Sequence, residues 1–113
     1  MDELLKFIDE QDKKLLKYFP NSTLQEEILS RTAKLTEEVG ELAGEVLASK
    51  GSQRKEKLEN HNNESLEGEF ADVVITTLLL AKTMNVDIKK SLKEKIGKIE
   101  KRFEKIEKEA SEK

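Results

Sequence analysis

Residues 66–84, LEGEFADVVITTLLLAKTM, form the stretch that decides the fold of this chain. The β-branched run at residues 73–77 favours a strand by propensity alone, but the stretch is too long for one strand and contains no proline. Its helical repeat is carried by Leu66, Phe70, Val73, Thr77, Leu80 and Met84. Because apolar residues also occupy its other faces, we predict a buried central helix over about residues 64–85.

Three more helices are predicted around this one, over about residues 2–19, 22–49 and 87–112. Pro20 ends the first of them. Ser22 is the expected N-cap of the second, with Gln25 completing a capping box, and Asp87 is expected to cap the last. The polar residues 50–63 are predicted to form a loop.

Two of these helices carry a regular apolar stripe that is expected to face a partner helix. The stripe of the second helix consists of Ile28, Thr32, Leu35, Val39, Leu42 and Val46. The stripe of the last helix consists of Ile88, Leu92, Ile96, Ile99, Phe103 and Ile106.

The composition agrees with an all-α fold. Of the 113 residues, 40% are charged and 35% hydrophobic, and only one is a proline. This mixture predicts a single domain, residues 1–113, built as a four-helix-bundle-like fold. A polar domain of this size has a thin core, so we expect an oligomer, in which more apolar surface is buried.

Several classes of protein are excluded by charge and hydropathy. A net charge of −3 and a pI of about 5.4 argue against a dedicated nucleic-acid binder. The longest apolar stretch, residues 73–81, is far too short to span a membrane. The first ten residues do not have the pattern of a signal peptide, and the chain has no cysteine. We therefore expect a cytoplasmic protein.

Four acidic residues form two pairs with a spacing that carries chemistry. Glu38 and Glu41 share one face of the second helix, and Glu69 and Asp72 share one face of the third. If these helices pack antiparallel, each pair lies at the flank of its stripe and the two pairs can converge. Four carboxylates repel one another unless they are protonated or bridged by cations, and their hard oxygen atoms suit Mg²⁺, or Mn²⁺, rather than Zn²⁺.

Such pairs can also arise by chance, because a chain so rich in glutamate contains other acidic pairs three residues apart. Asp72 stands out from that background, since it is the only charged residue between Phe70 and Ala81. A buried acid without a partner is costly, which predicts a metal ion or a basic residue beside Asp72. Glu41 is flanked by Gly40 and Gly44, which suggests the close approach of a helix or ligand there.

The two acidic segments resemble a known family. Residues 37–42, EEVGEL, followed by residues 69–73, EFADV, are similar to the E-E-x-x-E…E-x-x-D signature of MazG-type nucleotide pyrophosphohydrolases. The resemblance spans about residues 29–103. It implies an all-α fold assembled as a homodimer or homotetramer, and Mg²⁺-dependent hydrolysis of a nucleoside or deoxynucleoside triphosphate to the monophosphate and pyrophosphate.

The resemblance also assigns roles to individual residues. The four family metal positions correspond to Glu38, Glu41, Glu69 and Asp72. Glu37 and Glu38 are the expected catalytic acids, with Glu37 positioning or deprotonating the attacking water. The expected substrate-binding residues are Lys34, Lys95 and Arg102, and for Lys34, one turn before Glu38 on the same face, a salt bridge within the acidic cluster is the equal alternative to a phosphate contact. Ile99 stands where the family has an asparagine between Lys95 and Arg102, so the grip on the substrate is expected to differ.

Two alternatives remain open from the sequence. One is a phosphoribosyl-ATP pyrophosphohydrolase, which has a similar helical carboxylate site. The other is a helical oligomerisation module without enzymatic activity, against which Asp72 argues. His61 is expected to be a solvated loop residue, and Tyr18 and Phe19 are expected to lie in the core rather than to stack on a base.

Overall fold

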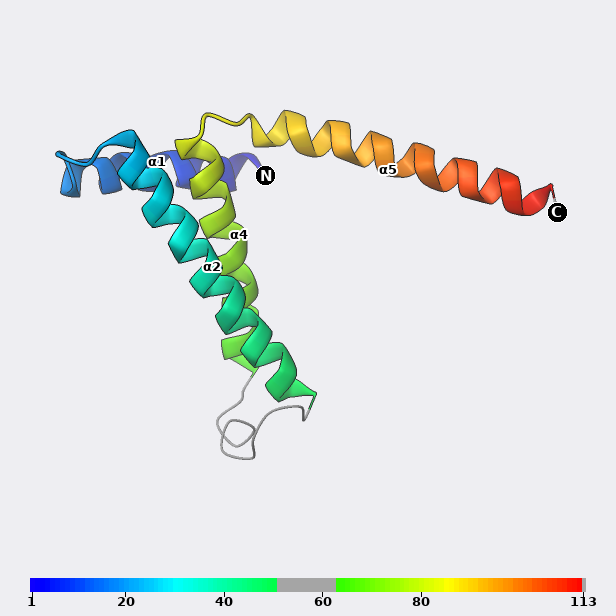
Figure 1. The fold of residues 1–113 in the computed structure, drawn as a ribbon, viewed down its shortest axis with the longest axis horizontal. Coiled ribbons are helices and arrows are strands. Elements are labelled where there is room, and N and C mark those ends of the chain that lie inside the picture. The colour runs from blue at the N-terminus through cyan, green and yellow to red at the C-terminus, as the bar shows by residue number, and fades with distance from the viewer. Residues whose placement is uncertain (51–62, 113) are drawn as a thin grey trace.

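The computed structural model describes residues 1–50 and 63–112, which form helices joined by short turns (Figure 1). The helices are α1 (Asp2–Tyr18), α2 (Leu24–Ser49), α4 (Asn63–Thr83) and α5 (Ile88–Ser111). No residue in the two described ranges belongs to a strand, so the predicted all-α fold is confirmed. The helix ends lie within one or two residues of the expected positions. The loop expected at residues 50–63 falls almost wholly outside the described residues.

The start of α2 differs from the prediction by one residue. Thr23, not Ser22, is the N-cap, and Glu26, not Gln25, completes the capping box. The hydroxyl of Thr23 accepts a hydrogen bond from the backbone N–H of Glu26 at 3.1 Å, and the carboxylate of Glu26 accepts one from the backbone N–H of Thr23 at 3.4 Å. The negative charge of Glu26 also interacts favourably with the positive end of the helix dipole, which the neutral Gln25 cannot do.

The α2 and α4 helices lie side by side and antiparallel, and α1 crosses them near the start of α2 and the end of α4 (Figure 1). The buried apolar side chains come from all three helices: Ile8 of α1, Ala48 of α2 and Leu78 of α4. Within the described part of the chain, α4 is the helix that packs against both α1 and α2. It is therefore central, as the sequence predicts.

One ionic group fixes the crossing of these three helices. Arg31 of α2 donates from Nη1 to Asp12 of α1 at 2.7 Å, and the same nitrogen donates to the backbone oxygen of Leu79 at 3.4 Å and to the hydroxyl of Thr83, both in α4. The Arg31 and Asp12 side chains are only 11% and 16% exposed. Truncating either one would leave a partly buried charge unpaired, which is more costly than the loss of a surface ion pair.

Two burial predictions are wrong. In α2, the covered face contains Leu35, Glu38 and Leu42, whereas Val39 and Val46 of the predicted stripe are 47% and 37% exposed. The packed face thus shares Leu35 and Leu42 with the apolar stripe but is turned towards Glu38, which lies within it rather than at its flank.

The helix α4 is not buried on all sides. Its residues Phe70 and Val74 are 52% and 49% exposed, because α1 and α2 cover only part of its circumference. The described helices therefore leave part of the apolar surface of α2 and α4 exposed.

A tight junction separates α4 from α5. Asn85 adopts a left-handed conformation with φ of 57°, its N–H donates to the oxygen of Lys82, and the N–H of Val86 donates to the oxygen of Ala81. These two bonds form a Schellman motif, which satisfies the last carbonyl groups of α4. Asp87 then caps α5 by accepting from the N–H of Lys90 at 3.1 Å, as predicted.

From this junction α5 leads away from α2 and α4 (Figure 1). Its first turn is tied to α1 by an ion pair of 2.8 Å between Lys89 and Asp2, but no residue of α5 is buried. The radius of gyration is 18.8 Å, whereas a compact domain of about this length has about 13 Å. Within residues 1–50 and 63–112, no helix combines the length and the apolarity needed to cross a membrane.

Candidate metal centre

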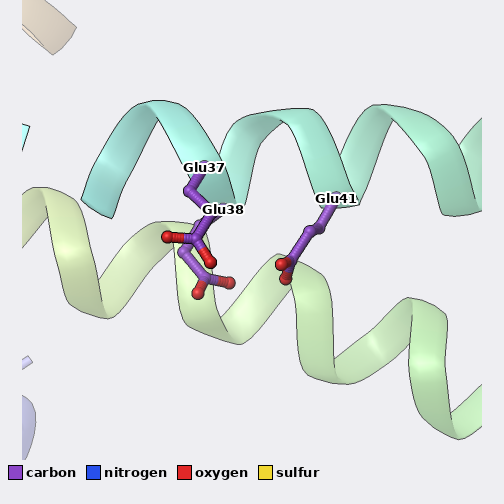
Figure 2. A group of neighbouring side chains, drawn as sticks. All are labelled: Glu37, Glu38 and Glu41. Atoms are coloured by element: carbon purple, nitrogen blue, oxygen red, sulfur yellow. The ribbon is translucent and has the colours of Figure 1, made fainter. Parts of the chain in front are cut away.

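Acidic side chains gather where α2 and α4 pack against each other. They are Glu37, Glu38, Glu41, Glu69 and Asp72. Residues three positions apart project from the same face of a helix, so the antiparallel arrangement brings the pair of α2 opposite the pair of α4. Figure 2 shows Glu37, Glu38 and Glu41 extending from α2 towards α4.

Glu38 belongs to two groups of potential metal ligands. Carboxylate oxygens of Glu37, Glu38 and Glu41 lie within 4.8 Å of one another, and those of Glu38, Glu69 and Asp72 do the same. The structure thus brings together the residues that the sequence proposed as metal ligands, and it places Glu37 beside them.

The burial of these acids differs from the prediction. Glu38 is the buried one, at 6% exposure, and Glu69 is half-buried, whereas Glu41 and Asp72 are exposed. Asp72 was expected to be buried because its sequence neighbours are apolar, but Phe70 and Val74 are themselves exposed in this chain. The argument from Asp72 is therefore wrong in its physical reason.

At Gly40, no described helix makes the expected close approach, and the approach of a ligand there stays a prediction. A Cβ atom built there would meet nothing within 4 Å, so no helix approaches closely at that point.

Two carboxylate oxygens carry the argument for a bound cation instead. The Oε2 atoms of Glu38 and Glu69 are shielded from solvent and accept no hydrogen bond. Buried polar atoms in proteins are normally satisfied, and an unpaired carboxylate oxygen away from water is costly. Hard divalent cations such as Mg²⁺ and Mn²⁺ prefer several carboxylate oxygens, so this donor set fits them.

Lys34 provides positive charge at one edge of the cluster. Its Nζ lies 3.1 Å from Oε1 of Glu38, one helical turn ahead, and 3.7 Å from Oε1 of Glu37. The hydrogen bond to Glu38, followed by the charges of Glu37 and Glu38, raises the pKa of Lys34 above its usual value. The structure therefore gives Lys34 as a salt-bridge partner within the cluster, and its contact with a phosphate stays a prediction.

The electrostatic strain of the cluster is visible at Glu69. Removal from water raises the pKa of its carboxyl group most, and the negative charges of Glu41, Glu38 and Asp72 raise it further. Lys34 pairs with the Glu37–Glu38 side, so the Glu69 side is where an added cation would relieve the most repulsion.

The other two expected substrate-binding residues are not brought to this site. Lys95 and Arg102 are exposed on α5, which leads away from α2 and α4 (Figure 1). Ile99 between them is 45% exposed. His61 lies outside the described residues. Tyr18 and Phe19, expected in the core, are 77% and 63% exposed, so that expectation is wrong.

Sequence reasoning missed a groove that begins beside the acids. It has a volume of about 470 Å³ and is lined along α2 from Glu26 to Glu37, with Leu15 and Phe19 from α1 and the segment after it, and with Thr76 and Leu79 from α4. The one signal in the sequence is that Glu27, Ser30 and Lys34 recur at helical spacing before Glu38.

Comparison with known proteins bears on the same helices. The sequence profile of the MazG-like family matches residues 23–113, which include α2, α4 and α5 and all of the acids described above. No curated protein and no solved structure shows significant similarity to the chain. The match covers most of the sequence, and it agrees with the fold and with the acidic signature of α2 and α4. The chain belongs to the MazG-like family.

Proposed function

We propose that this protein is a Mg²⁺-dependent nucleotide pyrophosphohydrolase, which cleaves a nucleoside or deoxynucleoside triphosphate between its α and β phosphates. The observation that carries the proposal is the pair of buried, unpaired oxygens of Glu38 and Glu69 in a cluster of acids from two helices. A structural scaffold gains nothing from such atoms, whereas a cation site uses them. Family membership supports the same reaction class.

The metal ion would be held by Glu38, Glu41, Glu69 and Asp72. When bound, Mg²⁺ supplies positive charge that stabilises the negative charge on the phosphate oxygens during the reaction. Mn²⁺ has the same preference for carboxylate oxygens and is expected to replace it.

Glu37 has a different position and a different role. It is exposed, its carboxylate lies beside Glu38, and it belongs to the α2 group but not to the group with Glu69 and Asp72. A carboxylate at the edge of a cation site can accept a proton from water and hold that water against a phosphate. We assign this role to Glu37, with Glu38 as the acid that links it to the metal ligands.

The proposed reaction consumes only water and the triphosphate. The water oxygen forms a bond to the α phosphorus, and the bond from the α phosphorus to the oxygen that bridges to the β phosphate breaks. Pyrophosphate leaves with the electron pair, and the proton of the water passes to Glu37.

Lys95 and Arg102, the other two expected substrate-binding residues, are proposed to act between copies of the chain. The site is acidic and its surroundings on α2 and α4 leave Val39, Phe70 and Val74 exposed. The helix α5 carries nine basic and five acidic side chains and an unpaired apolar stripe. It is complementary to this surface in both charge and polarity, so a homodimer or homotetramer can supply Lys95 and Arg102 to the phosphates of a neighbouring site.

The test is pyrophosphate release by the full chain from each common NTP and dNTP and from phosphoribosyl-ATP, with Mg²⁺, with Mn²⁺ and with EDTA. We expect turnover of at least one triphosphate, loss of activity in EDTA, and a decrease of at least about 100-fold in Glu38→Gln, because even outer-shell changes at metal sites cost 10- to 100-fold. Turnover of phosphoribosyl-ATP alone would select the alternative enzyme.

Thermal unfolding gives a second readout that does not depend on the substrate. At a Mg²⁺ concentration of about 100 times its Kd, the free energy of unfolding should rise by about 2.7 kcal/mol. Glu38→Gln should lose this increase, and Glu67→Gln, an exposed acid on the same helix as Glu69, should keep both the increase and the activity. No turnover of any substrate, together with no effect of Mg²⁺ on unfolding, would refute the proposal.

A further inference from the structure

The groove beside the metal centre connects the acidic cluster with the end of α1. Lys34 and Glu37 line it at one end, and both belong to the cluster of charges described above. Phe19 lines it at the other end. A volume of about 470 Å³ lies within the range of small-molecule sites, about 300–1,000 Å³.

The length of the groove fits the sugar and base of a nucleotide. The residues of α2 that line it descend from Lys34 to Glu27, seven positions apart, which corresponds to about 10 Å along the helix axis. With the phosphates at the acids, a sugar beside Lys34 and Ser30 would leave the base between Phe19 and Glu27. Phe19 is 63% exposed as a residue, so a base can stack on its ring, and such stacking tolerates any base.

Two acids lie at the base end of the groove, and they are not equivalent. The carboxylate of Glu26 is engaged in the capping box with Thr23. The carboxylate of Glu27 is on a half-buried residue and makes no ion pair or side-chain hydrogen bond with any described residue. It is therefore the acceptor that a ligand would meet.

The neighbouring Arg31 does not change the hydrogen-bond-accepting character of this end of the groove. Arg31 also lines the groove, but its Nη1 is bound to Asp12, to the oxygen of Leu79 and to the hydroxyl of Thr83. Because an ionised carboxylate only accepts hydrogen bonds, Glu27 favours a base edge that donates them. Cytosine carries an exocyclic amino group at the position where uracil and thymine present a carbonyl oxygen, and adenine and guanine each carry an amino group on one edge.

We propose that this groove binds the nucleoside of the substrate, and that Glu27 selects bases with an exocyclic amino group over uracil and thymine. The inference rests on the proposed function, since it places the triphosphate at the metal centre. Phe19 supplies affinity for any base, and Glu27 supplies the discrimination.

The test compares kcat/KM for CTP and UTP, whose bases differ by an amino group and a carbonyl oxygen at one position. The wild-type chain should prefer CTP by about 10-fold or more, the discrimination that one good side-chain contact to a base provides. Glu27→Gln, which can donate as well as accept, should bring the ratio close to one, mainly by improving UTP. Glu26→Gln is the matched control, because glutamine also completes a capping box, and it should keep the wild-type ratio.

Binding of CMP and UMP, followed by the backbone amide shifts of the full chain, separates this inference from the proposed function. Selective shifts around Phe19 and Glu27 with CMP, without turnover of any triphosphate, would support the groove and refute the enzyme. Turnover with a CTP-to-UTP ratio that is the same in wild type and Glu27→Gln, or a wild-type preference for UTP, would refute the role of Glu27 and leave the enzyme in place.

Discussion

The pair α2–α4 and the helix α5 carry comparable apolar repeats, but these repeats are covered to different extents within this chain. Leu78 of α4 is 7% exposed, whereas Leu92 and Ile99 of α5 are 39% and 45% exposed. The first two helices cover each other and create the acidic site between them. The helix α5 is covered by nothing in the described residues beyond its first turn. A helical repeat shows that a face needs a partner, and only the structure shows whether the partner lies in the same chain.

The largest expected effect comes from a matched pair of leucines. Leu78→Ala should lower the free energy of unfolding by about 2–5 kcal/mol at every protein concentration, because it opens a cavity inside the α1–α2–α4 core. Leu92→Ala should lower it only at concentrations where copies associate, because Leu92 is 39% exposed in this chain and the proposed association would cover it. Chemical denaturation over a wide range of concentrations measures both. An equal loss for Leu92→Ala in very dilute protein would break the comparison, because α5 would then be packed within its own chain.

A mixing experiment tests whether α5 serves a neighbouring site. Arg102→Ala should lower kcat/KM by about 10- to 100-fold, the value of a charge-assisted hydrogen bond, and Glu38→Gln should inactivate its own carboxylate site. An equal mixture of the two variants, unfolded and refolded together, should regain about a quarter of wild-type activity if α5 crosses to the partner in a two-fold symmetric dimer. Each mixed dimer then has one intact site.

The control for this mixture is a chain that carries both substitutions, mixed with wild type. If the mixture of single variants stays as inactive as the variants alone, Arg102 acts on the carboxylates of its own chain or on none. In that case the proposed contribution of α5 to a neighbouring site is refuted, while the metal centre itself is unaffected.

The smallest expected effect is a pH dependence of stability that originates at Glu69. Its pKa in the folded chain is raised above the ordinary value of 4.5, so the folded state holds this proton more tightly than the unfolded state. The corresponding stability is fully present below pH 4.5 and is lost as the pH rises through the raised pKa. In EDTA, the melting temperature of wild type relative to Glu69→Gln should therefore fall as the pH rises above 4.5.

At neutral pH, added Mg²⁺ should raise the melting temperature of wild type relative to Glu69→Gln, because the ionised Glu69 then gains a cation and the glutamine does not. A difference in melting temperature that is constant with pH, or that grows in favour of wild type in EDTA, would contradict the electrostatic account of the cluster.

The sequence predicted the helices and the convergence of their acids well, since both follow from spacing. Glu38 and Glu41 share a face wherever the helix lies, and so do Glu69 and Asp72. Which acid is buried depends on how far each helix is rotated about its axis, and this is set by packing. The apolar stripe of α2 includes Val39 and Val46, but the face that meets α4 contains Glu38. The least exposed of the proposed metal ligands is therefore one that spacing alone could not identify.

The N-cap and the groove escaped prediction for other physical reasons. Ser22 and Thr23 are both good caps and are followed at the same distance by Gln25 and Glu26, so local sequence does not decide between them. The groove is lined by Phe19 and Leu79, which are far apart in the sequence and come to one groove because α1 packs against α4. The direction of α5 also cannot be predicted from the spacing of its apolar residues.

That direction is determined by the few residues between Thr83 and Ile88. The left-handed Asn85 ends α4, and the cap of Asp87 starts α5, so the angle between the helices is set by a local backbone geometry and not by the contents of either helix. In the proposed oligomer, this junction would set the direction in which α5 meets a neighbouring copy. One residue inserted inside α5, after its first turn, would turn the rest of its stripe by about 100° relative to the carboxylates. Spacing and angle between neighbouring copies could therefore change while every acid of the metal centre stays in place.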